Sequence, residues 1–258
     1  MSAVLVIGAT RGLGASLVRR FAATGNSVVY GTSRSSTVPT GFPEHVKWLS
    51  AIDLMKSSVG DDIVKYFVDS KPLSTVIITA GHFSTEDISA EKGPNWDAEL
   101  QMYTTSSVAP VFIVHRLVHA GLLAQGSKVV LVSSEAGSIG LRHEKEGGGN
   151  YAHHASKSAL NMVGKLLSLD LKERGVIVSI VHPGFMRTEM TKGVGYDKYW
   201  DAGGAVTPDE AASSLIKWTD ELDISKSGEY WAPRGPRDIG TAAETLGTNL
   251  KTPLHLPW

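Results

Sequence analysis

The stretch AVLVIGATRGLG, residues Ala3 to Gly14, decides the fold. Its first half is a short, continuously apolar run rich in β-branched residues, which is typical of a strand buried on both faces of a parallel sheet. Gly8, Gly12 and Gly14 follow, and a segment with helical spacing begins directly after them. Glycines permit a tight turn and a close approach of backbone amides to a phosphate, and the amino end of a helix favours negative charge. We therefore expect a phosphate-binding turn; a tight turn without a ligand is the alternative.

Strand-like and helix-like segments alternate along the rest of the chain. Further strands are predicted over residues 27–34, 46–54, 74–81, 127–137, 176–184 and 228–233. Helical patterns cover residues 58–72, 95–126, 153–175 and 207–222. This alternation predicts an α/β fold: one doubly wound parallel sheet of about seven strands with helices on both faces, in a single domain over residues 1–258. Ligands of such sheets lie at the carboxyl ends of the strands.

Composition narrows the class of protein. The chain has 258 residues, 42% of them hydrophobic, with a formal net charge of −1, so no global field favours nucleic acid or an anionic membrane. It has no cysteine, which excludes disulfides, thiolate metal sites and cysteine nucleophiles. It has no basic leader and no apolar run of roughly 18 residues. We expect a soluble cytoplasmic protein that binds neither nucleic acid nor membrane.

The spacing Gly-x-x-x-Gly-x-Gly resembles that of the short-chain dehydrogenase/reductase family, and the resemblance extends over nearly the whole chain. The motifs that carry it are TAG (79–81), VSSEAG (132–137), ASKSALN (155–161) and HPGFMRTEM (182–190). The closing LPW and the GGG-x-Y stretch resemble the C-factor-like branch of that family. The resemblance implies a Rossmann-type fold and hydride transfer between a nicotinamide cofactor and a carbonyl or alcohol.

Chemistry at the second predicted strand favours NADP(H) over NAD(H). NADP carries a phosphate on its ribose and needs cationic donors, whereas the free hydroxyl of NAD is usually bound by a carboxylate. The strand ends in YGTSR without an acidic residue, Arg34 lies just beyond Ser33, and Arg11 lies in the glycine turn. The resemblance implies this cofactor-binding set: Gly8, Thr10, Arg11, Gly12, Leu13, Gly14, Ser33, Arg34, Asp53, Leu54, Ala80, Gly81, Lys157, Pro183, Gly184 and Thr188.

The catalytic set implied by the resemblance is altered in this chain. The family uses a serine, a tyrosine, a lysine four residues after the tyrosine, and an asparagine. Ser134 and Lys157 match the serine and the lysine, but His153 stands at the tyrosine position and Ser106 at the asparagine position. His153 and Lys157 are one helical turn apart and share a face.

Three interpretations of the altered set stay open. His153 donates the proton, since imidazole moves protons near neutral pH, although a nearby Lys157 cation favours the neutral ring. Alternatively, Tyr151 substitutes, which requires the helix to start later and the glycine-rich loop before it to fold back. In the third interpretation the site performs no carbonyl reduction: the protein is an isomerase, dehydratase or cyclase, or a cofactor-binding regulator without turnover.

Apolar and aromatic residues after the Pro-Gly turn are candidates for substrate binding. They are Phe185, Met186, Tyr196, Tyr199 and Trp200. Aromatic side chains there would cover an apolar substrate, and a packed lid or a subunit contact is the alternative. His115 and His119 have the four-residue spacing of metal ligands but no further ligand nearby, so we expect no metal. The resemblance also implies a homodimer or homotetramer.

Overall fold

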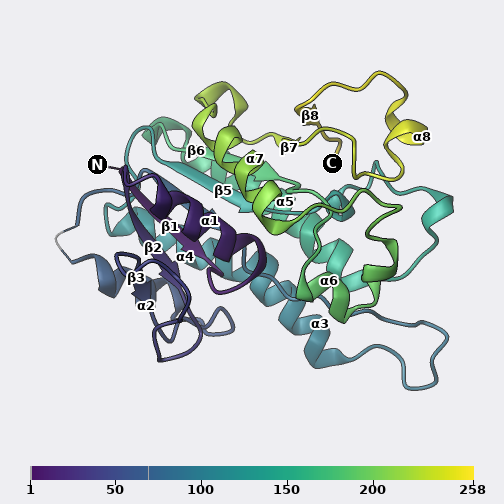
Figure 1. Cartoon of the computed structure of the whole chain (residues 1–258), viewed down its shortest axis with the longest axis horizontal. Helices are drawn as coiled ribbons and strands as arrows, with labels where there is room; N and C mark the ends of the chain where they lie inside the picture. The colour runs from purple at the N-terminus through teal and green to yellow at the C-terminus, as the bar shows by residue number, and fades with distance from the viewer. Residues whose placement is uncertain (1, 69) are drawn as a thin grey trace.

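The computed structural model describes residues 2–68 and 70–258. The described strands form one eight-stranded sheet, and Figure 1 shows how the elements are arranged. The strand order is β3-β2-β1-β4-β5-β6-β7-β8. The first seven are parallel and β8 is antiparallel to β7. The bounds are β1 Ser2–Ile7, β2 Ser27–Thr32, β3 Lys47–Leu49, β4 Thr75–Ile78, β5 Lys128–Val132, β6 Ile177–Val181, β7 Tyr230–Ala232 and β8 Leu254–His255.

The strand order confirms the predicted Rossmann-type fold. The chain runs outward from β1 to β2 and β3, then returns to β4 on the other side of β1. This reversal of direction leaves a crevice at the carboxyl ends of β1 and β4, where such sheets bind their ligands. The additional strand β8 has only two residues, and so short a strand has no pattern that a sequence could reveal.

Helices cover both faces of the sheet (Figure 1). The bounds are α1 Gly12–Ala23, α2 Val59–Val64, α3 Trp96–Tyr103, α4 Ala109–His119, α5 Tyr151–Asp170, α6 Glu189–Gly193, α7 Pro208–Asp220 and α8 Ala242–Leu246. Leu5 and Ile7 of β1 lie in the core shared with α2, α4 and α5, whereas Val4 and Val6 lie in the core shared with α1 and α7. Consecutive residues of a strand point to opposite faces, so the unbroken apolar run of β1 supplies both cores.

Two predicted elements differ in detail from the structure. The helical region over residues 95–126 is divided into α3, a π-helical segment at Thr104–Val108, and α4. Such π segments occur often at functional sites. The strand predicted over residues 46–54 is ordered as a strand only at Lys47–Leu49, because Ala51 has a positive φ of 58° that ends the extended backbone. In the helix predicted over residues 58–72, residue 69 lies outside the described residues.

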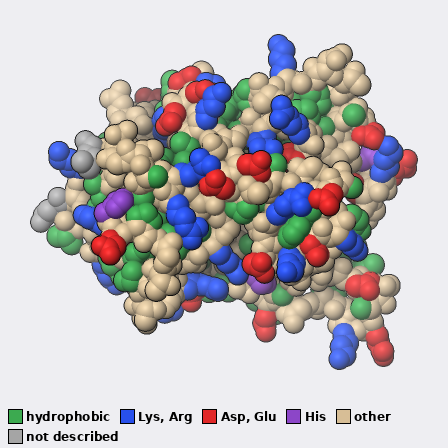
Figure 2. Space-filling view, viewed as in Figure 1, with side chains coloured by type: hydrophobic (Ala, Val, Ile, Leu, Met, Phe, Trp, Pro, Cys, Tyr) green, Lys and Arg blue, Asp and Glu red, His purple; other side chains and the backbone are tan. Residues whose placement is uncertain are grey.

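Charges are mixed on the surface. On the face in Figure 2, Lys and Arg side chains lie among Asp and Glu side chains, in keeping with the net charge of −1. In the described part of the chain, every helix is too short or too polar to cross a membrane.

Candidate active site

A large cleft of about 1520 Å³ opens at the carboxyl ends of β1, β4, β5 and β6. Fifteen of the sixteen residues in the predicted cofactor set line it, and Ser33 does not. Ser33 is buried, and its Oγ accepts the Ser35 N–H at 3.1 Å within a turn. The neighbouring side chains of Thr32 and Ile52 line the cleft there instead.

The glycine turn between β1 and α1 is built by close backbone contacts. A β-carbon on Gly8 would lie 2.7 Å from the Ala80 nitrogen, and one on Gly14 would lie 2.1 Å from the Gly8 oxygen. Both contacts are shorter than real atoms allow, so larger residues would force the strand, the turn and the helix apart. The amino end of α1 has no side-chain cap and no acidic residue in its first turn. Its free N–H groups suit a phosphate.

Two arginines line the same end of the cleft. Arg11 and Arg34 are exposed, and neither forms an ion pair with a carboxylate in the described part of the chain. Burial, and then the charges of Arg11 and Arg34, lower the pKa of His82, so both guanidinium groups act on the same point of the cleft. This positive potential is available to an anionic ligand.

Asp53 and Thr188 line the cleft and also cap turns. Asp53 Oδ1 accepts the Met55 N–H at 3.0 Å, and Thr188 Oγ1 accepts the Thr191 N–H at 3.2 Å in a capping box at the start of α6. The capping role of Asp53 is compatible with its place in the predicted cofactor-binding set, because the turn uses only one of its two carboxylate oxygens.

Ser134 lies at the cleft directly beyond β5. Its Oγ accepts the Ala136 N–H at 3.2 Å, and its carbonyl accepts a hydrogen bond from the Tyr230 hydroxyl. The hydroxyl proton of Ser134 makes no hydrogen bond to the described residues. It is free to be donated to a substrate oxygen.

Lys157 is buried beneath the cleft. Its Nζ donates to the Val132 carbonyl at 2.9 Å, and burial lowers the pKa of Lys157 to about 8. A β-carbon on Gly81 would lie 3.8 Å from this Nζ and 4.0 Å from Ser106 Oγ, so the two groups flank one point. Ser106 Oγ is buried without a hydrogen-bond partner in the described structure. The short serine leaves the asparagine position without an amide.

His153 lines the cleft one turn before Lys157 on α5. Its ring stacks on Phe83 with centroids 4.1 Å apart, and its Nδ1 is buried without a described partner. Burial lowers the pKa of His153 to about 3, with smaller contributions from the positive charges of Lys157, His154 and Arg142. The imidazole is therefore neutral at physiological pH.

Two other side chains of the first turn of α5 also face the cleft. Tyr151 is its first helical residue, is 46% exposed, and lies with its hydroxyl near the Gly148 backbone. The helix thus starts earlier than the start at residue 153 expected from sequence, and the later start that a catalytic Tyr151 would need is absent. His154 also lines the cleft, and its Nδ1 lies 2.8 Å from the Asn150 oxygen.

An aromatic wall closes one side of the cleft; we use this name for Phe83, His153, Tyr196 and Tyr199. Tyr196 packs edge-on against Phe83 at 5.6 Å and against Tyr199 at 6.0 Å. Its hydroxyl accepts a hydrogen bond from Asn150 Nδ2 at 2.7 Å, which joins the segment after α6 to the start of α5. The wall therefore combines three segments that are distant in sequence.

The remaining predicted substrate residues divide into two groups. Phe185 and Met186 line the cleft, as expected. Trp200 does not line it: its Nε1 donates to Thr191 Oγ1 at 3.2 Å, and Arg187 lies over its ring. The side chain of Trp200 therefore contacts Thr191 and Arg187, and the prediction that it binds the substrate is not supported by its position.

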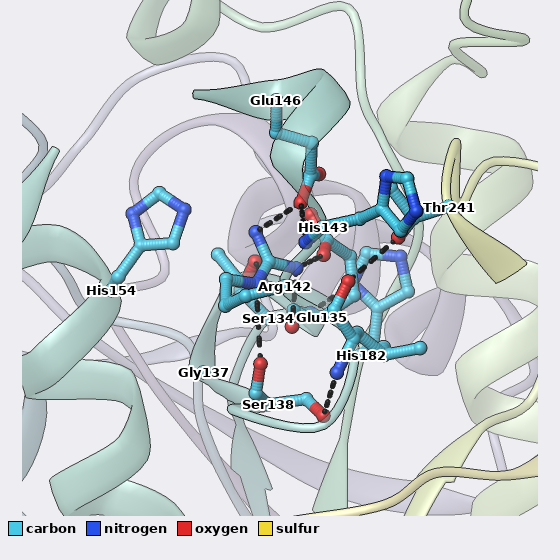
Figure 3. Close-up of polar contacts among 12 residues, drawn as sticks. Ser134, Glu135, Gly137, Ser138, Arg142, His143, Glu146, His154, His182 and Thr241 are labelled. Carbon is cyan, nitrogen blue, oxygen red and sulfur yellow. Dashed lines mark hydrogen bonds and ion pairs between the residues drawn. The ribbon is translucent and has the colours of Figure 1, made fainter. Parts of the chain in front are cut away.

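Several cleft residues were not found from sequence: Phe83, Glu135, Arg142, Glu146, His182, Arg237 and Asp238. Figure 3 shows Arg142 between Glu135 and Glu146, with ion pairs to both. Phe83 and His182 have a positional signal, since each adjoins a motif turn at a strand end. Arg237 and Asp238 lie in the carboxyl-terminal segment, where no motif indicates that the chain returns to the cleft.

The histidine pair His115 and His119 lies on α4, away from the cleft. Both are exposed, with ring centroids 4.3 Å apart. Within residues 2–68 and 70–258, no group of three or more histidine or acidic side chains is placed to hold a metal ion.

Comparison with known proteins identifies the family. A family model described as short chain dehydrogenase matches residues 2–198, which include the glycine turn, Ser134, His153 and Lys157. The chain belongs to the short-chain dehydrogenase family. The family prediction is thereby confirmed, while the narrower resemblance to the C-factor-like branch stays a prediction.

Two curated relatives cover nearly the whole of this short-chain dehydrogenase. The 1-hydroxy-2-glutathionyl-2-methyl-3-butene dehydrogenase of Rhodococcus sp. (strain AD45) is 28% identical over 239 residues, 89% of this chain and 96% of the relative. An uncharacterized oxidoreductase of Saccharomyces cerevisiae is 30% identical over 255 residues, 91% of this chain and 96% of the relative. Among solved structures, the NADPH-bound carbonyl reductase from chicken fatty liver has a TM-score of 0.74 at 22% identity, covering 90% of this chain and 91% of that one.

Proposed function

We propose that this short-chain dehydrogenase is an NADP(H)-dependent oxidoreductase that acts on a carbonyl or alcohol group of a small-to-medium, apolar metabolite. The observation that carries the proposal is the convergence of the glycine turn, the two arginines, Ser134, His153 and Lys157 on one cleft. The names of the Rhodococcus relative, a dehydrogenase, and of the chicken protein, a carbonyl reductase, support a redox reaction. The aromatic wall supports an apolar substrate.

The lining of the cleft fits NADP(H). The free N–H groups at the amino end of α1 suit the two bridging phosphates, and Arg11 and Arg34, without carboxylate partners among the described residues, suit the ribose phosphate. By its resemblance to the family's lysine, Lys157 would bind the nicotinamide ribose. When bound, the nicotinamide supplies or accepts a hydride. The residues of this chain bind the reacting molecules, orient them and move the proton.

We infer that His153 acts as a neutral hydrogen-bond donor. With a pKa of about 3, only about 10⁻⁴ of the ring is protonated at pH 7. A buried N–H without an acceptor is costlier than a buried acceptor without a donor, so the partnerless Nδ1 carries the lone pair and Nε2 carries the proton. The Nε2–H group then faces the cleft and stabilises negative charge on the substrate oxygen.

Ser134 and Lys157 complete the proposed mechanism. Ser134 offers its free hydroxyl proton to the same substrate oxygen, as a second donor. Lys157, whose pKa is lowered to about 8, is an acid of suitable strength at neutral pH and supplies the proton that completes the alcohol. His153 therefore stabilises the oxygen, while Lys157 is the source of the proton.

The same observations also favour a second candidate. A ring with a pKa of about 3 is a weak acid/base catalyst, and Ser106 lacks the amide of the family's proton relay. The second candidate is a protein that binds NADP without turnover, or a non-redox isomerase, dehydratase or cyclase on this scaffold.

We further propose a homodimer or homotetramer that associates through α4 and α5. Val111 and Phe112 of α4 are exposed, as are Met162, Leu166 and Leu169 of α5. The three α5 residues follow helical spacing and form one stripe. Both helices pack on the same face of the sheet, so their outer faces form an apolar surface of the kind that usually meets a partner.

The test of the proposed function combines binding with turnover. Fluorescence titration with NADPH and NADH measures the two affinities, and the loss of NADPH absorbance measures turnover with a panel of aldehydes, quinones and activated ketones such as trifluoroacetophenone. We expect NADPH to bind more tightly and at least one carbonyl compound to be reduced. NADPH binding without turnover of any carbonyl or alcohol would support the second candidate, and equal or tighter NADH binding would contradict the cofactor assignment.

A further inference from the structure

Behind Ser134 lies a buried polar pair that the proposed mechanism does not use. His182 follows β6 and is 4% exposed, and Asp238 lies between β7 and α8 and is 8% exposed. His182 Nδ1 accepts the Glu135 N–H at 2.9 Å, so the ring holds the backbone directly after Ser134. Figure 3 shows His182 beside the turn that carries Ser134 and Glu135.

His182 and Asp238 face each other, each through one atom that has no hydrogen-bond partner in the described structure. Because Nδ1 of His182 accepts a hydrogen bond, the neutral ring carries its proton on Nε2. Nε2 lies 3.8 Å from Asp238 Oδ1, and both atoms are buried without a hydrogen-bond partner in the described structure. This distance is longer than a hydrogen bond, and a small rotation of either side chain would close it.

The other oxygen of Asp238 holds a second turn. Asp238 Oδ2 accepts the Phe185 N–H at 2.8 Å and lies 3.6 Å from Arg234 Nε. A β-carbon on Gly184 would lie 2.5 Å from this oxygen, so the carboxylate approaches the Pro-Gly turn as closely as a glycine with a φ of +110° permits. Burial raises the pKa of Asp238, but His182, the Phe185 N–H and Arg234 outweigh it and lower that pKa. Asp238 is therefore a carboxylate.

We propose that His182 and Asp238 are positioning residues that lock the Ser134 turn against the Pro183–Phe185 turn. This inference rests on the proposed function. Ser134 offers its proton to the substrate oxygen. The Pro183–Phe185 turn lines the same cleft with Pro183 and Gly184 of the predicted cofactor set and with Phe185, a predicted substrate residue. One buried linkage sets the distance between the Ser134 turn and the Pro183–Phe185 turn. It runs from the Glu135 N–H through His182 and Asp238 to the Phe185 N–H.

A purely stabilising role explains the pair less well. Buried imidazole and carboxylate groups lose their hydration, and well-packed apolar residues of similar size often stabilise a protein as much or more. The pair instead supplies directed hydrogen bonds at both ends. A donor displaced by about 1 Å from a reacting atom can lower a rate about 10²-fold, so such direction matters most beside Ser134.

The kinetic test uses two substitutions of one residue. His182→Leu removes the acceptor for the Glu135 N–H, whereas the Oδ1 atom of His182→Asn can replace Nδ1. With NADPH and trifluoroacetophenone, we expect His182→Leu to lower kcat about 10- to 100-fold, with the Kd for NADPH unchanged within about threefold. His182→Asn should recover most of the lost kcat, which a general loss of packing would not predict.

Ser179→Ala is the matched control. Ser179 lies on β6, the strand that His182 follows, and its Oγ accepts a buried hydrogen bond from Trp218 Nε1 of α7 at 3.1 Å. Its loss should lower the Tm without lowering kcat. The inference is overturned if His182→Leu keeps kcat within about threefold of wild type, below the effect of a displaced donor, or if Ser179→Ala loses as much kcat as His182→Leu.

A readout independent of turnover separates this inference from the proposed function. Exchange of the Glu135 amide hydrogen, followed by NMR, reports the bond to His182 directly. We expect slow exchange in wild type and in His182→Asn, and fast exchange in His182→Leu. If the wild-type protein reduces no carbonyl compound, the proposed function fails. The linkage is then tested by the exchange measurement alone, and identical exchange of the Glu135 amide in all three proteins overturns it.

Discussion

At the scale of single residues, the surroundings of His153 determine the protonation state of its ring. A free imidazole titrates near neutral pH, but stacking on Phe83 and burial near Lys157 keep this ring neutral. The feature that it shares with the family's tyrosine is an uncharged hydrogen-bond donor on the same helical face as the lysine. Its role should therefore be tested by substitutions that keep or remove the donor.

His153→Phe keeps the stacking on Phe83 and removes the donor, so we expect kcat to fall about 10²- to 10³-fold with little change in NADPH affinity. His153→Gln keeps an N–H donor that does not titrate and should retain more activity than His153→Phe. His153→Tyr restores the family motif and should improve reduction of simple ketones. Steady-state kinetics of the three variants check these outcomes. Activity of His153→Phe within about threefold of wild type, far below the loss of a catalytic donor, would remove His153 from the mechanism.

The low pKa of His153 also predicts how stability depends on pH. The folded-state pKa of about 3 lies below the unfolded value of about 6.5, so the unfolded chain binds more protons between these values. His153 therefore contributes stability above pH 6.5 that is lost as the pH falls toward 3. At pH 4 the loss reaches at most about 3 kcal/mol. Denaturant unfolding from pH 7 to pH 4 should show a smaller decline for His153→Phe than for wild type, and parallel declines would contradict the shifted pKa.

Arg34 is the residue on which the cofactor preference depends most directly. It is exposed in the cleft without a carboxylate partner among the described residues, so its charge is available to a phosphate. We expect Arg34→Ala to lose about 1.5–3 kcal/mol of NADPH binding, which is roughly tenfold or more in Kd. NADH lacks the phosphate and serves as the control, measured by the same fluorescence titration. An equal loss for both cofactors would indicate a structural effect instead.

At the scale of elements, the active site depends on the joining of α5 to the segment after α6. Asn150 is the residue before α5, with a positive φ of 52°, and its amide donates to the Tyr196 hydroxyl. Tyr196 in turn packs on Phe83, which stacks on His153. A single chain of contacts thus connects the aromatic wall to the helix that carries His153 and Lys157.

We expect Tyr196→Ala to open the aromatic wall and raise the KM for an apolar carbonyl substrate about 3- to 10-fold, because aromatic contacts contribute about 0.5–1.5 kcal/mol. NADPH affinity should stay unchanged, since Tyr196 lies on the substrate side. Trp200→Ala is the matched comparison: Trp200 does not line the cleft, so its KM should change less. If the two substitutions raise the KM equally, the whole segment that carries Tyr196 and Trp200 acts as a packed lid.

At the scale of the whole molecule, the outer faces of α4 and α5 expose apolar side chains that one chain alone does not cover. They expose Phe112, Met162, Leu166 and Leu169 over one side of the sheet, whereas the face in Figure 2 carries mixed charges. Burying such side chains against a second chain stabilises an assembly by about 25 cal/mol for each Å² of apolar surface. The predicted homo-oligomer would use this side.

Size-exclusion chromatography with light scattering should give two or four times the 27.5 kDa of one chain. Leu166→Glu places a charge in the middle of the apolar stripe and should shift the mass to that of one chain, because an unpaired buried charge is costly. Ile224→Glu, at a residue that is 52% exposed far from α5 in sequence, is the control and should keep the oligomer. A wild type with the mass of one chain would contradict the proposal.

Much of the fold and of the cofactor site could be predicted because both depend on local patterns. The apolar run of β1, the glycines after it and the alternation of strands with helices follow from backbone geometry and from burial on two faces. Fifteen predicted cofactor residues line the cleft because parallel strands bring their carboxyl ends to one edge. Ser33 was the exception, since a turn that binds its hydroxyl directs it inward.

The sequence by itself determined the family, the sheet and the spacing that places His153 one turn before Lys157. Only the tertiary structure decided the charge of His153, because the stacked Phe83 and the buried surroundings come from segments that no local pattern joins to α5. The same holds for the pair His182 and Asp238, which are 56 residues apart in the numbering and meet across the end of the sheet. Periodicity and spacing indicate how a single segment folds. The pKa of a side chain, or its buried contacts, depends on which distant segments pack against that side chain and remove water from it.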